Sequence, residues 1–423
     1  MMFELLAEKV KSHQIDTQSP MITAFRFEMA EFGALLAWLK AQHLFPQYYL
    51  NFRDSDNKIA ALGKVRSFGD EISAQQFIEQ TQQPLIGGLT FDKKGHFWLP
   101  RLLIEQQKDQ VVISVFMDNQ ADLAQEKQQA LNVIQTLTHF SELEPLNSQA
   151  RLVSQKANQE VWCHWIEQAL RAIEQGELNK VVLANESLFE SAQPINAKDF
   201  LAESEKQNTG CYHFLYAETP ESTFVGSTPE RLFERSGVQV KTEALAGTAL
   251  MSDDVQQNQA QADWLLHDQK NDDENWLVVK DICDNLQEFV SHIQVGDVEL
   301  KQLRRVQHLR RCIQAELKPS FADAACLHAI HPTAAVSGLP QQNALAFLQK
   351  TENFDRTWYA GTLGMMTQSH GEFCVTIRCA FIEQNNIRIF AGAGIVAGSI
   401  PLLEWQEIER KASGLVTLLG TGK

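Results

Sequence analysis

The chain has 423 residues, which is long enough for two domains or for one large domain. Hydrophobic residues make up 44% and charged residues 21%, a composition typical of a folded globular protein that excludes an intrinsically disordered one. The formal net charge of −16 argues against a surface for nucleic acid or an anionic membrane, because phosphate groups need clustered Lys and Arg. We therefore expect any anionic ligand to be held locally, by a few basic side chains or by a metal ion.

The N-terminal stretch MMFELLAEKV carries Glu4 and Glu8 among its apolar residues and lacks the pattern of a signal peptide. No stretch approaches the ~18 uninterrupted apolar residues of a membrane span. The seven cysteines are scattered, without a C-x-x-C pair, which argues against a disulfide framework and against a zinc site. We expect a protein of the reducing cytoplasm, with no membrane segment.

The first ~140 residues combine strand-like runs at 47–52 and 61–68 with a helix-like segment at 29–43. Polarity rises between 141 and 160, ahead of a helix predicted over 162–176 by its apolar spacing. This rise suggests a boundary near residue 150. We expect residues 1–150 to be an N-terminal subregion and residues 151–423 to hold the catalytic chemistry.

The remaining chain alternates antiparallel hairpins with helices. One hairpin is predicted to turn at Ser236-Gly237 and another at Asn385-Asn386, each with apolar alternation on both sides. A helix is predicted over 272–290, and another ends the chain. Because the elements do not alternate regularly as βαβ units, the predicted fold class is α+β.

The stretch GAGIVAGSIPLLEWQEIERK (392–411) leads a glycine-rich turn into the last helix. Ser399 is a suitable N-cap and Pro401 fits the first turn. At helical spacing Glu404 falls on the apolar stripe of this helix, and Glu407 lies on its flank. A buried carboxylate without a partner is costly, so we expect a cation, a donor or a metal beside it.

Other residues are ambiguous on pattern alone. Glu274 falls on the apolar stripe of another helix, and two such glutamates on separate helices are weak evidence for a metal, with oxygen ligands favouring Mg²⁺ over zinc. A lone strand lysine such as Lys180 is most often a solvated edge residue, and Glu243 reads as a surface acid at a strand end. Arg378, flanked by apolar residues, is expected to be buried with a carboxylate partner. His331 opens a turn-rich loop.

Taken in order, these stretches resemble the chorismate-utilising enzyme family. The motifs that carry the resemblance are KVVLA, GSTPERLF, TEALAGTAL, K-x-x-x-E, HPTAAVSG-x-P, R-x-x-Y-A-G-x-x-G, VTIR and GAGIV-x-GS-x-P-x-x-EWQE-x-x-x-K. The resemblance is close from Leu178 to the C-terminus and faint before it, as at FWLPRL. It implies a single large domain of stacked antiparallel β-sheets with helices outside.

The resemblance also implies roles for residues of the matching motifs. Lys180 is similar to the family's general base for water, and Glu243 to its general acid for the departing hydroxyl. The positions that match Mg²⁺ ligands are Glu274 and Glu407, with Glu404 as a further acidic neighbour. The positions that match substrate contacts are Gly247, Thr248, His331, Tyr359, Arg378 and Gly394.

The activity implied is that of an isochorismate synthase, particularly of the type that feeds menaquinone synthesis. A Lys at position 180 favours water as the nucleophile, and Ala246 stands where aminodeoxychorismate synthases have a nucleophilic Lys, so no glutamine amidotransferase subunit is expected. The alternatives are a salicylate synthase, which shares that Lys, and an isochorismate synthase of a siderophore pathway. A non-catalytic chorismate-binding protein is the alternative of a different class. Asn275, where His is common in the family, leaves fine specificity open.

Overall fold

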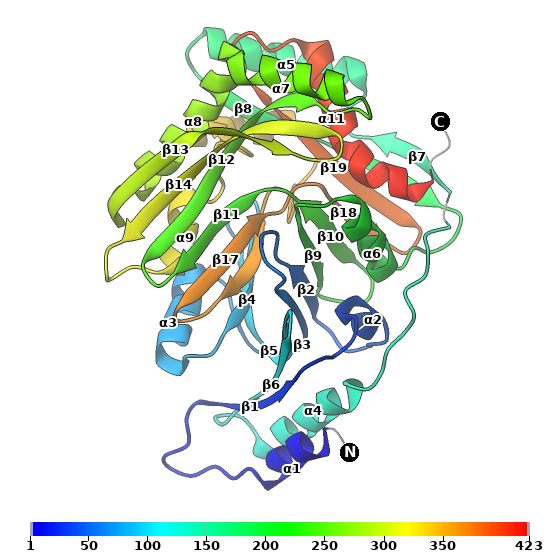
Figure 1. Ribbon diagram of the computed structural model, residues 1–423, viewed down its shortest axis with the longest axis vertical. Coiled ribbons are helices and arrows are strands. Elements are labelled where there is room, and N and C mark those ends of the chain that lie inside the picture. Colours follow the sequence, from blue (N-terminus) through cyan, green and yellow to red (C-terminus); the bar gives the residue numbers. More distant parts are fainter. Residues whose placement is uncertain (1–2, 148, 421–423) are drawn as a thin grey trace.

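The computed structural model describes residues 3–147 and 149–420. In this part of the chain, 19 strands form one sheet (Figure 1). Its strands are β1 (Ile22–Met29), β2 (Gln47–Asn51), β3 (Lys58–Phe68), β4 (Leu85–Leu89), β5 (Gly95–Gln107), β6 (Gln110–Asp118), β7 (Ala150–Gln155), β8 (Lys180–Ser191), β9 (Tyr212–Ala217), β10 (Thr223–Thr228), β11 (Arg231–Ser236), β12 (Gln239–Leu250), β13 (Val290–Gln302), β14 (Val306–Leu317), β15 (Gly338–Leu339), β16 (Thr362–Met366), β17 (His370–Val375), β18 (Cys379–Glu383) and β19 (Asn386–Ile395).

Helices cover the outside of this sheet. They are α1 (Glu4–Ser12), α2 (Leu35–Lys40), α3 (Glu71–Thr81), α4 (Leu123–Thr136), α5 (Gln159–Glu174), α6 (Ala197–Gln207), α7 (Val255–His267), α8 (Gln269–Leu286), α9 (Asp323–Ile330), α10 (Gln341–Thr351), α11 (Pro401–Val416) and the short 3₁₀ helix η1 (Thr417–Leu419). Among the helices of the described ranges, none combines the length and apolar character needed to cross a membrane.

The strand order brings distant parts of the chain together. Pairing runs from β7 through β8, β19, β18, β10, β9, β2, β3, β5, β4, β16, β17, β11, β12 and β14 to β13. All of these pairings are antiparallel, so the predicted α+β class with antiparallel strands is confirmed. The predicted stacked sheets are parts of one continuous sheet, in which the β8–β19 and β12–β14 portions form two arms.

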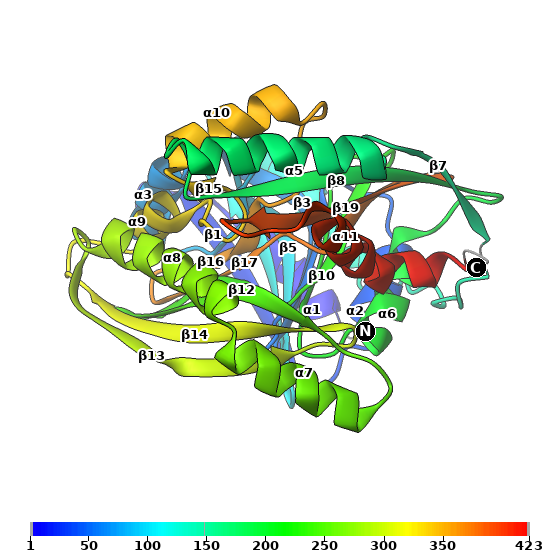
Figure 2. The same ribbon diagram turned by 90° about the horizontal axis from the view of Figure 1, so that it is seen from above.

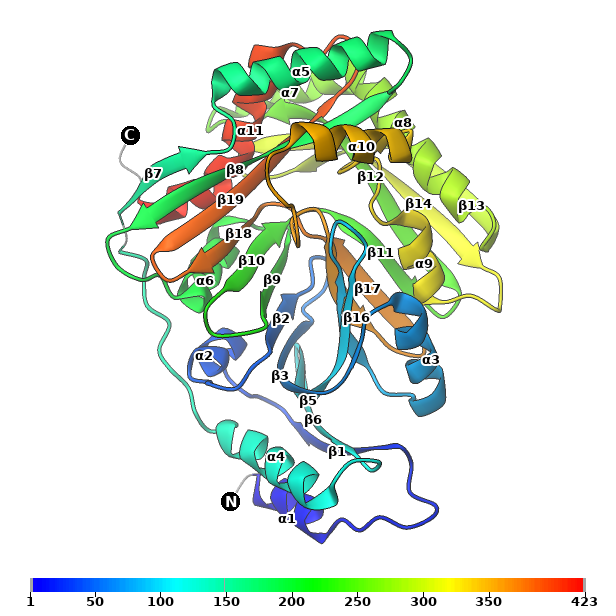
Figure 3. The same ribbon diagram turned by 180° about the vertical axis from the view of Figure 1, so that it is seen from behind.

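Strands from the first 150 residues are built into the same sheet. β2 pairs with β9, and β4 pairs with β16. Seen from behind, the N-terminal strands continue directly into those from the second half of the chain (Figure 3). Side chains from both halves therefore pack into the same core, as Tyr48, Trp98 and Tyr216 do.

Two helices flank the arms of the sheet. α11 packs on β19 and against α5, where Trp405 lies 6.5 Å from Trp162 between ring centroids. α8 packs on β12 and β14. Viewed from above, α8 and α11 lie on either side of the space between the arms (Figure 2). This arrangement directs Glu274 of α8 and Glu407 of α11 toward the same space between the arms.

Most predicted elements form, with two local differences. The turn at Ser236-Gly237 closes the β11–β12 hairpin, with Gly237 at φ 59°. The helix predicted over 29–43 shortens to α2, because Gly33 has φ 77° and interrupts the helical backbone. Ser399 is not the N-cap of α11: the cap residue is Ile400, and the Ser399 hydroxyl accepts a hydrogen bond from the Val396 N–H at 3.2 Å.

Candidate active site

A cavity of about 650 Å³, counting its part open to solvent, lies between the two arms of the sheet. Polar groups reach it from β12 and β14, from α8 and α11, and from three loops. Those on which the chemistry depends are Thr248, His308, Glu274, Glu407, Lys411, Glu230, Tyr359 and Arg378. The remaining lining is apolar or glycine, so a ligand bound here would be largely removed from water.

Lys180 lies directly behind one wall of this cavity, against Glu274 and Gly394, which both line it. Lys180 begins β8 and is 1% exposed, and its Nζ lies 2.9 Å from Glu274 Oε1 on α8. Gly394 on β19 leaves room for this contact, because a Cβ there would lie 2.4 Å from Glu274 Oε1 and 3.1 Å from Lys180 Cε. The predicted base, metal ligand and substrate-binding glycine are therefore neighbours.

Arg378 brings an uncompensated cation into the cavity. It lies between β17 and β18 with φ 52°, and its Nη2 is 3.4 Å from His308 Nε2. The expected carboxylate partner is absent: within the described residues, no carboxylate oxygen lies within 4 Å of this guanidinium. Burial lowers the pKa of Arg378, as expected for a cation removed from water without a counterion. A bound anion would supply the missing charge.

The neighbouring positions match the predicted substrate contacts. Tyr359 stacks on Phe390 with ring centroids 5.2 Å apart, and burial raises the pKa of its hydroxyl, which stays a neutral donor. Gly392 allows this hydroxyl to approach, since a Cβ there would lie 2.6 Å from it. Thr248 lines the cavity beside Gly247, with its Oγ1 3.1 Å from His308 Nδ1.

Glu243 does not line the cavity, contrary to expectation. Its Oε1 lies 2.5 Å from Arg53 Nη1 and its Oε2 lies 3.1 Å from Arg53 Nη2. Oε1 also accepts a hydrogen bond from the Arg231 backbone N–H at 2.9 Å. Glu243 is therefore ion-paired behind the cavity and does not face a ligand in it. The geometry does not support its predicted role as general acid.

Glu230 has the properties expected of that acid. It lines the cavity, is 4% exposed, and comes directly before β11. Burial and the nearby Glu243 charge raise the pKa of Glu230 to about 8. Sequence reasoning quoted its motif, GSTPERLF, but assigned the residue no role, because nothing in the local pattern shows that this glutamate turns inward.

His331 also lies outside the cavity. It is 1% exposed, its Nε2 donates to the Thr90 carbonyl oxygen at 2.9 Å, and burial lowers its pKa to about 4. The loop that it opens reaches the cavity through Ala335 and Val336. The loop that begins at His331 therefore contacts the cavity, but the His331 side chain, which was predicted to contact the substrate, does not.

Two basic residues of the cavity were missed by the sequence reasoning. His308 on β14 is fully enclosed, and burial together with Arg378 lowers its pKa well below the usual range, so it is neutral. Lys411 on α11 lies 2.6 Å from Glu407 Oε1 and donates to the Gly392 carbonyl oxygen at 3.0 Å. Lys411 ends the last family motif, which was the one available indication.

Glu274, Glu404 and Glu407 form the acidic side of the site, although Glu404 does not line the cavity. Glu404 is 5% exposed with Lys270 Nζ 3.3 Å away, and burial together with Glu407 raises its pKa to about 7. Burial acts to raise the pKa of Glu407, but Lys411 outweighs it and the pKa is lowered. The first turns of α11 therefore place the carboxylates of Glu404 and Glu407 close together beside the cavity.

These carboxylates suit a Mg²⁺ ion. Within the described ranges, no three His, Cys, Asp or Glu side chains are already gathered as a complete ligand set. Mg²⁺ does not need one, because it commonly binds one or two carboxylates and takes water and ligand oxygens for the rest. Glu274 and Glu407, which both line the cavity, fit that pattern with oxygen donors alone.

The fold and the cavity define an enzyme-type site for a small anionic ligand, with a buried lysine, a neutral glutamic acid and an acidic cluster around it. The chain belongs to the family of chorismate binding enzymes, whose model matches residues 8–420.

Individual relatives support this membership. The isochorismate synthase MenF of Pasteurella multocida is 55% identical over 94% of this chain and 93% of its own length. The isochorismate synthase MenF of Escherichia coli is 40% identical over 91% of this chain and 90% of its own. The solved structure of the menaquinone-specific isochorismate synthase MenF from Escherichia coli superposes with a TM-score of 0.92, at 38% identity over 99% of each chain.

Proposed function

We propose that this protein is a Mg²⁺-dependent isochorismate synthase, an isomerase that interconverts chorismate and isochorismate for menaquinone synthesis. The observation that carries the proposal is one cavity lined by Glu230, whose pKa is raised to about 8, and by Arg378, with buried Lys180 directly behind its Glu274 wall. The solved structure with a TM-score of 0.92 over 99% of this chain is that of a menaquinone-specific isochorismate synthase, MenF, and relatives of the same name are 40–55% identical, which supports the pathway.

The reaction needs an anion site, a base and an acid. Chorismate is a dicarboxylate, so Arg378 and the Tyr359 hydroxyl hold one carboxylate while the Gly247–Thr248 backbone lies beside the other. Lys180, once deprotonated, accepts a proton from the water that attacks ring C2. Glu230 donates its proton to the C4 hydroxyl, which leaves as water while the ring double bonds shift. The base and the acid each contribute about 10²–10⁴ in rate.

Glu230 replaces Glu243 as the general acid in this scheme. A general acid must be protonated near neutral pH and must reach the leaving group. Glu230 satisfies both conditions, with a pKa raised to about 8 and its place in the cavity lining. Glu243, paired with Arg53, does not line the cavity and so does not meet the second condition.

Glu274 and Glu407 would hold the Mg²⁺, with Glu404 beside them. When bound, the cation would add positive charge beside these carboxylates for a dicarboxylate substrate. Chorismate is the expected small-molecule partner, without a glutamine amidotransferase subunit. All seven cysteines are free, which suits a reducing compartment, and we place the enzyme in the cytoplasm.

The decisive experiment incubates the purified protein with chorismate and Mg²⁺ and separates the products by chromatography. We expect isochorismate, loss of turnover with EDTA, and its return with added Mg²⁺. Salicylate as the main early product would favour a salicylate synthase, and aminated products formed only with ammonia would contradict the proposal.

Two variants test the assigned residues. Glu230→Gln should lower kcat by about 10²–10⁴ because it removes the proton donor but keeps the shape. Lys180→Ala should remove turnover similarly, while calorimetry still detects chorismate binding. Turnover that survives in Lys180→Ala would contradict its role as the base, whereas chorismate binding without any turnover in the unaltered protein would favour a non-catalytic chorismate-binding protein.

A further inference from the structure

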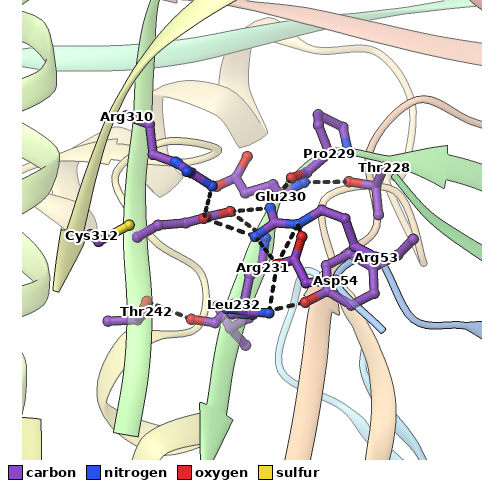
Figure 4. A network of polar contacts seen from close by, with 12 residues as sticks. Arg53, Asp54, Thr228, Pro229, Glu230, Arg231, Leu232, Thr242, Arg310 and Cys312 are labelled. Carbon is purple, nitrogen blue, oxygen red and sulfur yellow. Dashed lines mark hydrogen bonds and ion pairs between the residues drawn. The ribbon is translucent and has the colours of Figure 1, made fainter. Parts of the chain in front are cut away.

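A buried ion pair lies behind the cavity and contacts the chain on both sides of Glu230. Arg53, in the loop between β2 and β3, is paired with Glu243 on β12, and their side chains are 0% and 2% exposed. The Arg53 guanidinium donates to the Pro229 carbonyl oxygen, and Glu243 Oε1 accepts from the Arg231 N–H at 2.9 Å. Figure 4 shows Arg53 beside Pro229, Glu230 and Arg231 in this network.

Pro229 and Arg231 are the two chain neighbours of Glu230. The ion pair therefore holds the backbone immediately before and immediately after the proposed acid. Within the described residues, the Glu230 carboxyl itself forms no hydrogen bond or ion pair with another side chain. Its position in the cavity depends on its backbone, and two of the contacts that hold this backbone come from Arg53 and Glu243.

We propose that the Arg53–Glu243 ion pair is a positioning device that holds the Glu230 carboxyl in place for proton transfer to the leaving hydroxyl. The inference rests on the proposed function, in which Glu230 is the general acid. Arg53 and Glu243 are positioning residues, because they act through Glu230 and do not line the cavity.

Stability alone gives little reason for such a pair. Burying two charges carries a desolvation cost that their attraction often only offsets, and apolar residues of similar volume commonly serve as well. Positioning is a stronger reason, because misplacing a reacting group by about 1 Å can cost about 10²-fold in rate. The guanidinium fork also bonds a carboxylate and a carbonyl oxygen at once, which Lys cannot do in the same geometry.

The pair also sets the charge around Glu230. The charged groups that face Glu230 are Glu243 from β12, Arg53 from the β2–β3 loop, Lys180 from β8, Lys411 from α11 and Arg378 from the β17–β18 connection. The Glu243 carboxylate favours the protonated form of Glu230, and the cations oppose it. Removing one member of the pair should therefore shift the titration of Glu230 in a direction that depends on which member is lost.

The test compares kcat, KM and the pH dependence of kcat/KM in the conversion of chorismate, where Glu230 must be protonated. Glu243→Gln keeps the acceptor for the Arg231 N–H but removes the negative charge, so the alkaline limb should move to lower pH with a modest loss of kcat. Arg53→Gln removes the nearer cation beside Glu243 and Glu230 and leaves only Arg310 3.7 Å from Glu243, so the limb should move to higher pH. Glu243→Ala removes the backbone contact too, and kcat should fall about 10²-fold with little change in KM.

The Arg101–Glu126 pair supplies the matched control. It is equally buried, with Arg101 Nη1 2.6 Å from Glu126 Oε2, but it joins β5 to α4 and contacts no cavity residue. Arg101→Gln should lower the unfolding temperature without moving the pH profile. An unmoved alkaline limb in both Glu243→Gln and Arg53→Gln would overturn the inference, as would equal shifts in the control.

The outcomes for the inference and for the proposed function are separable. Full activity in Glu230→Gln would contradict the role of Glu230 and so the proposed mechanism. An inactive Glu230→Gln together with unchanged Glu243→Ala kinetics would contradict only the positioning role. If Arg53→Gln does not fold, Glu243→Gln, which is nearly isosteric, still decides the direction of the shift.

Discussion

At the scale of single residues, burial decides the charge states around the cavity. Glu230 is kept neutral, with its pKa raised to about 8, while the buried His308 is kept neutral by a lowered pKa. Arg378 stays charged because a guanidinium does not deprotonate near neutral pH, so it attracts an anion. The protonation states of Glu230 and His308 cannot be inferred from residue type alone, because each depends on neighbours from distant parts of the chain.

Arg378 should therefore contribute mainly to binding. Arg378→Gln should weaken chorismate binding about 10- to 100-fold, because one charged hydrogen bond contributes ~1.5–3 kcal/mol. Titration calorimetry with Mg²⁺ present measures this directly. Arg388→Gln is the matched control, because Arg388 pairs with Glu383 and Glu186 away from the cavity. Equal weakening in both variants would contradict the assigned role.

His331 should affect stability and its pH dependence more than catalysis. Its pKa is lowered from 6.5 to about 4 in the folded protein, so its contribution to stability is complete above pH ~6.5 and is lost as pH falls toward 4. His331→Gln should remove about 2–3 kcal/mol of that pH dependence. Urea unfolding at several pH values measures it, and exposed His292 provides a control, His292→Gln, that should change nothing. Loss of turnover in well-folded His331→Gln would restore the original assignment to the substrate site.

At the scale of elements, Asn275 fixes α8 to the sheet. Its Nδ2 lies within hydrogen-bond distance of the carbonyl oxygens of Ala244, Ala246 and Leu309, at 3.1–3.2 Å, and its Oδ1 accepts from Arg311 at 2.7 Å. Asn275 directly follows Glu274 on α8, and Ala244 and Ala246, which accept from it, precede the cavity residue Gly247 on β12. It therefore sets where Glu274 stands relative to Gly247.

Asn275→Ala should lower the free energy of unfolding by about 3 kcal/mol, because buried carbonyl groups and a guanidinium lose partners. Asn285→Ala is the control on the same helix, since Asn285 contacts only Asp281 at the surface. Urea denaturation compares them. A cost for Asn275→Ala no larger than that of Asn285→Ala would show that α8 is held by its apolar face alone.

At the scale of the whole molecule, the two halves of the chain share one sheet. β2 pairs with β9 and β4 pairs with β16, each joining the first half of the chain to the second, and Arg53 from the first half reaches the backbone beside Glu230. The boundary near residue 150 stays a prediction about a subregion. We propose that residues 1–150 form part of the same fold and contribute to the site through Arg53.

This interleaving predicts one cooperative unfolding transition. A fragment that begins at residue 151 should not fold, because β9 and β16 would each lose a strand partner and expose an apolar core. Calorimetry of the full chain should give equal calorimetric and van't Hoff enthalpies. Two resolved transitions, or a folded and active fragment, would contradict this expectation.

Particular residues show how far sequence reasoning reached. The family motifs pointed to Lys180, Glu274 and Gly394, which the structure brings together, and their roles stay predictions. The motifs gave the acid role to Glu243, whereas the cavity geometry favours Glu230, and nothing in the local patterns of these two glutamates separates them. The difference is made by Arg53, which lies 190 positions away in the chain.

The sequence by itself determined the α+β class, the hairpins and the family, because these depend on local periodicity, turn residues and ordered motifs. The tertiary structure alone decided which carboxyl is neutral, which is ion-paired, and which cation is left for a ligand. The physical reason is that burial and pairing are set by contacts between distant strands, and those contacts fix the charge of each group.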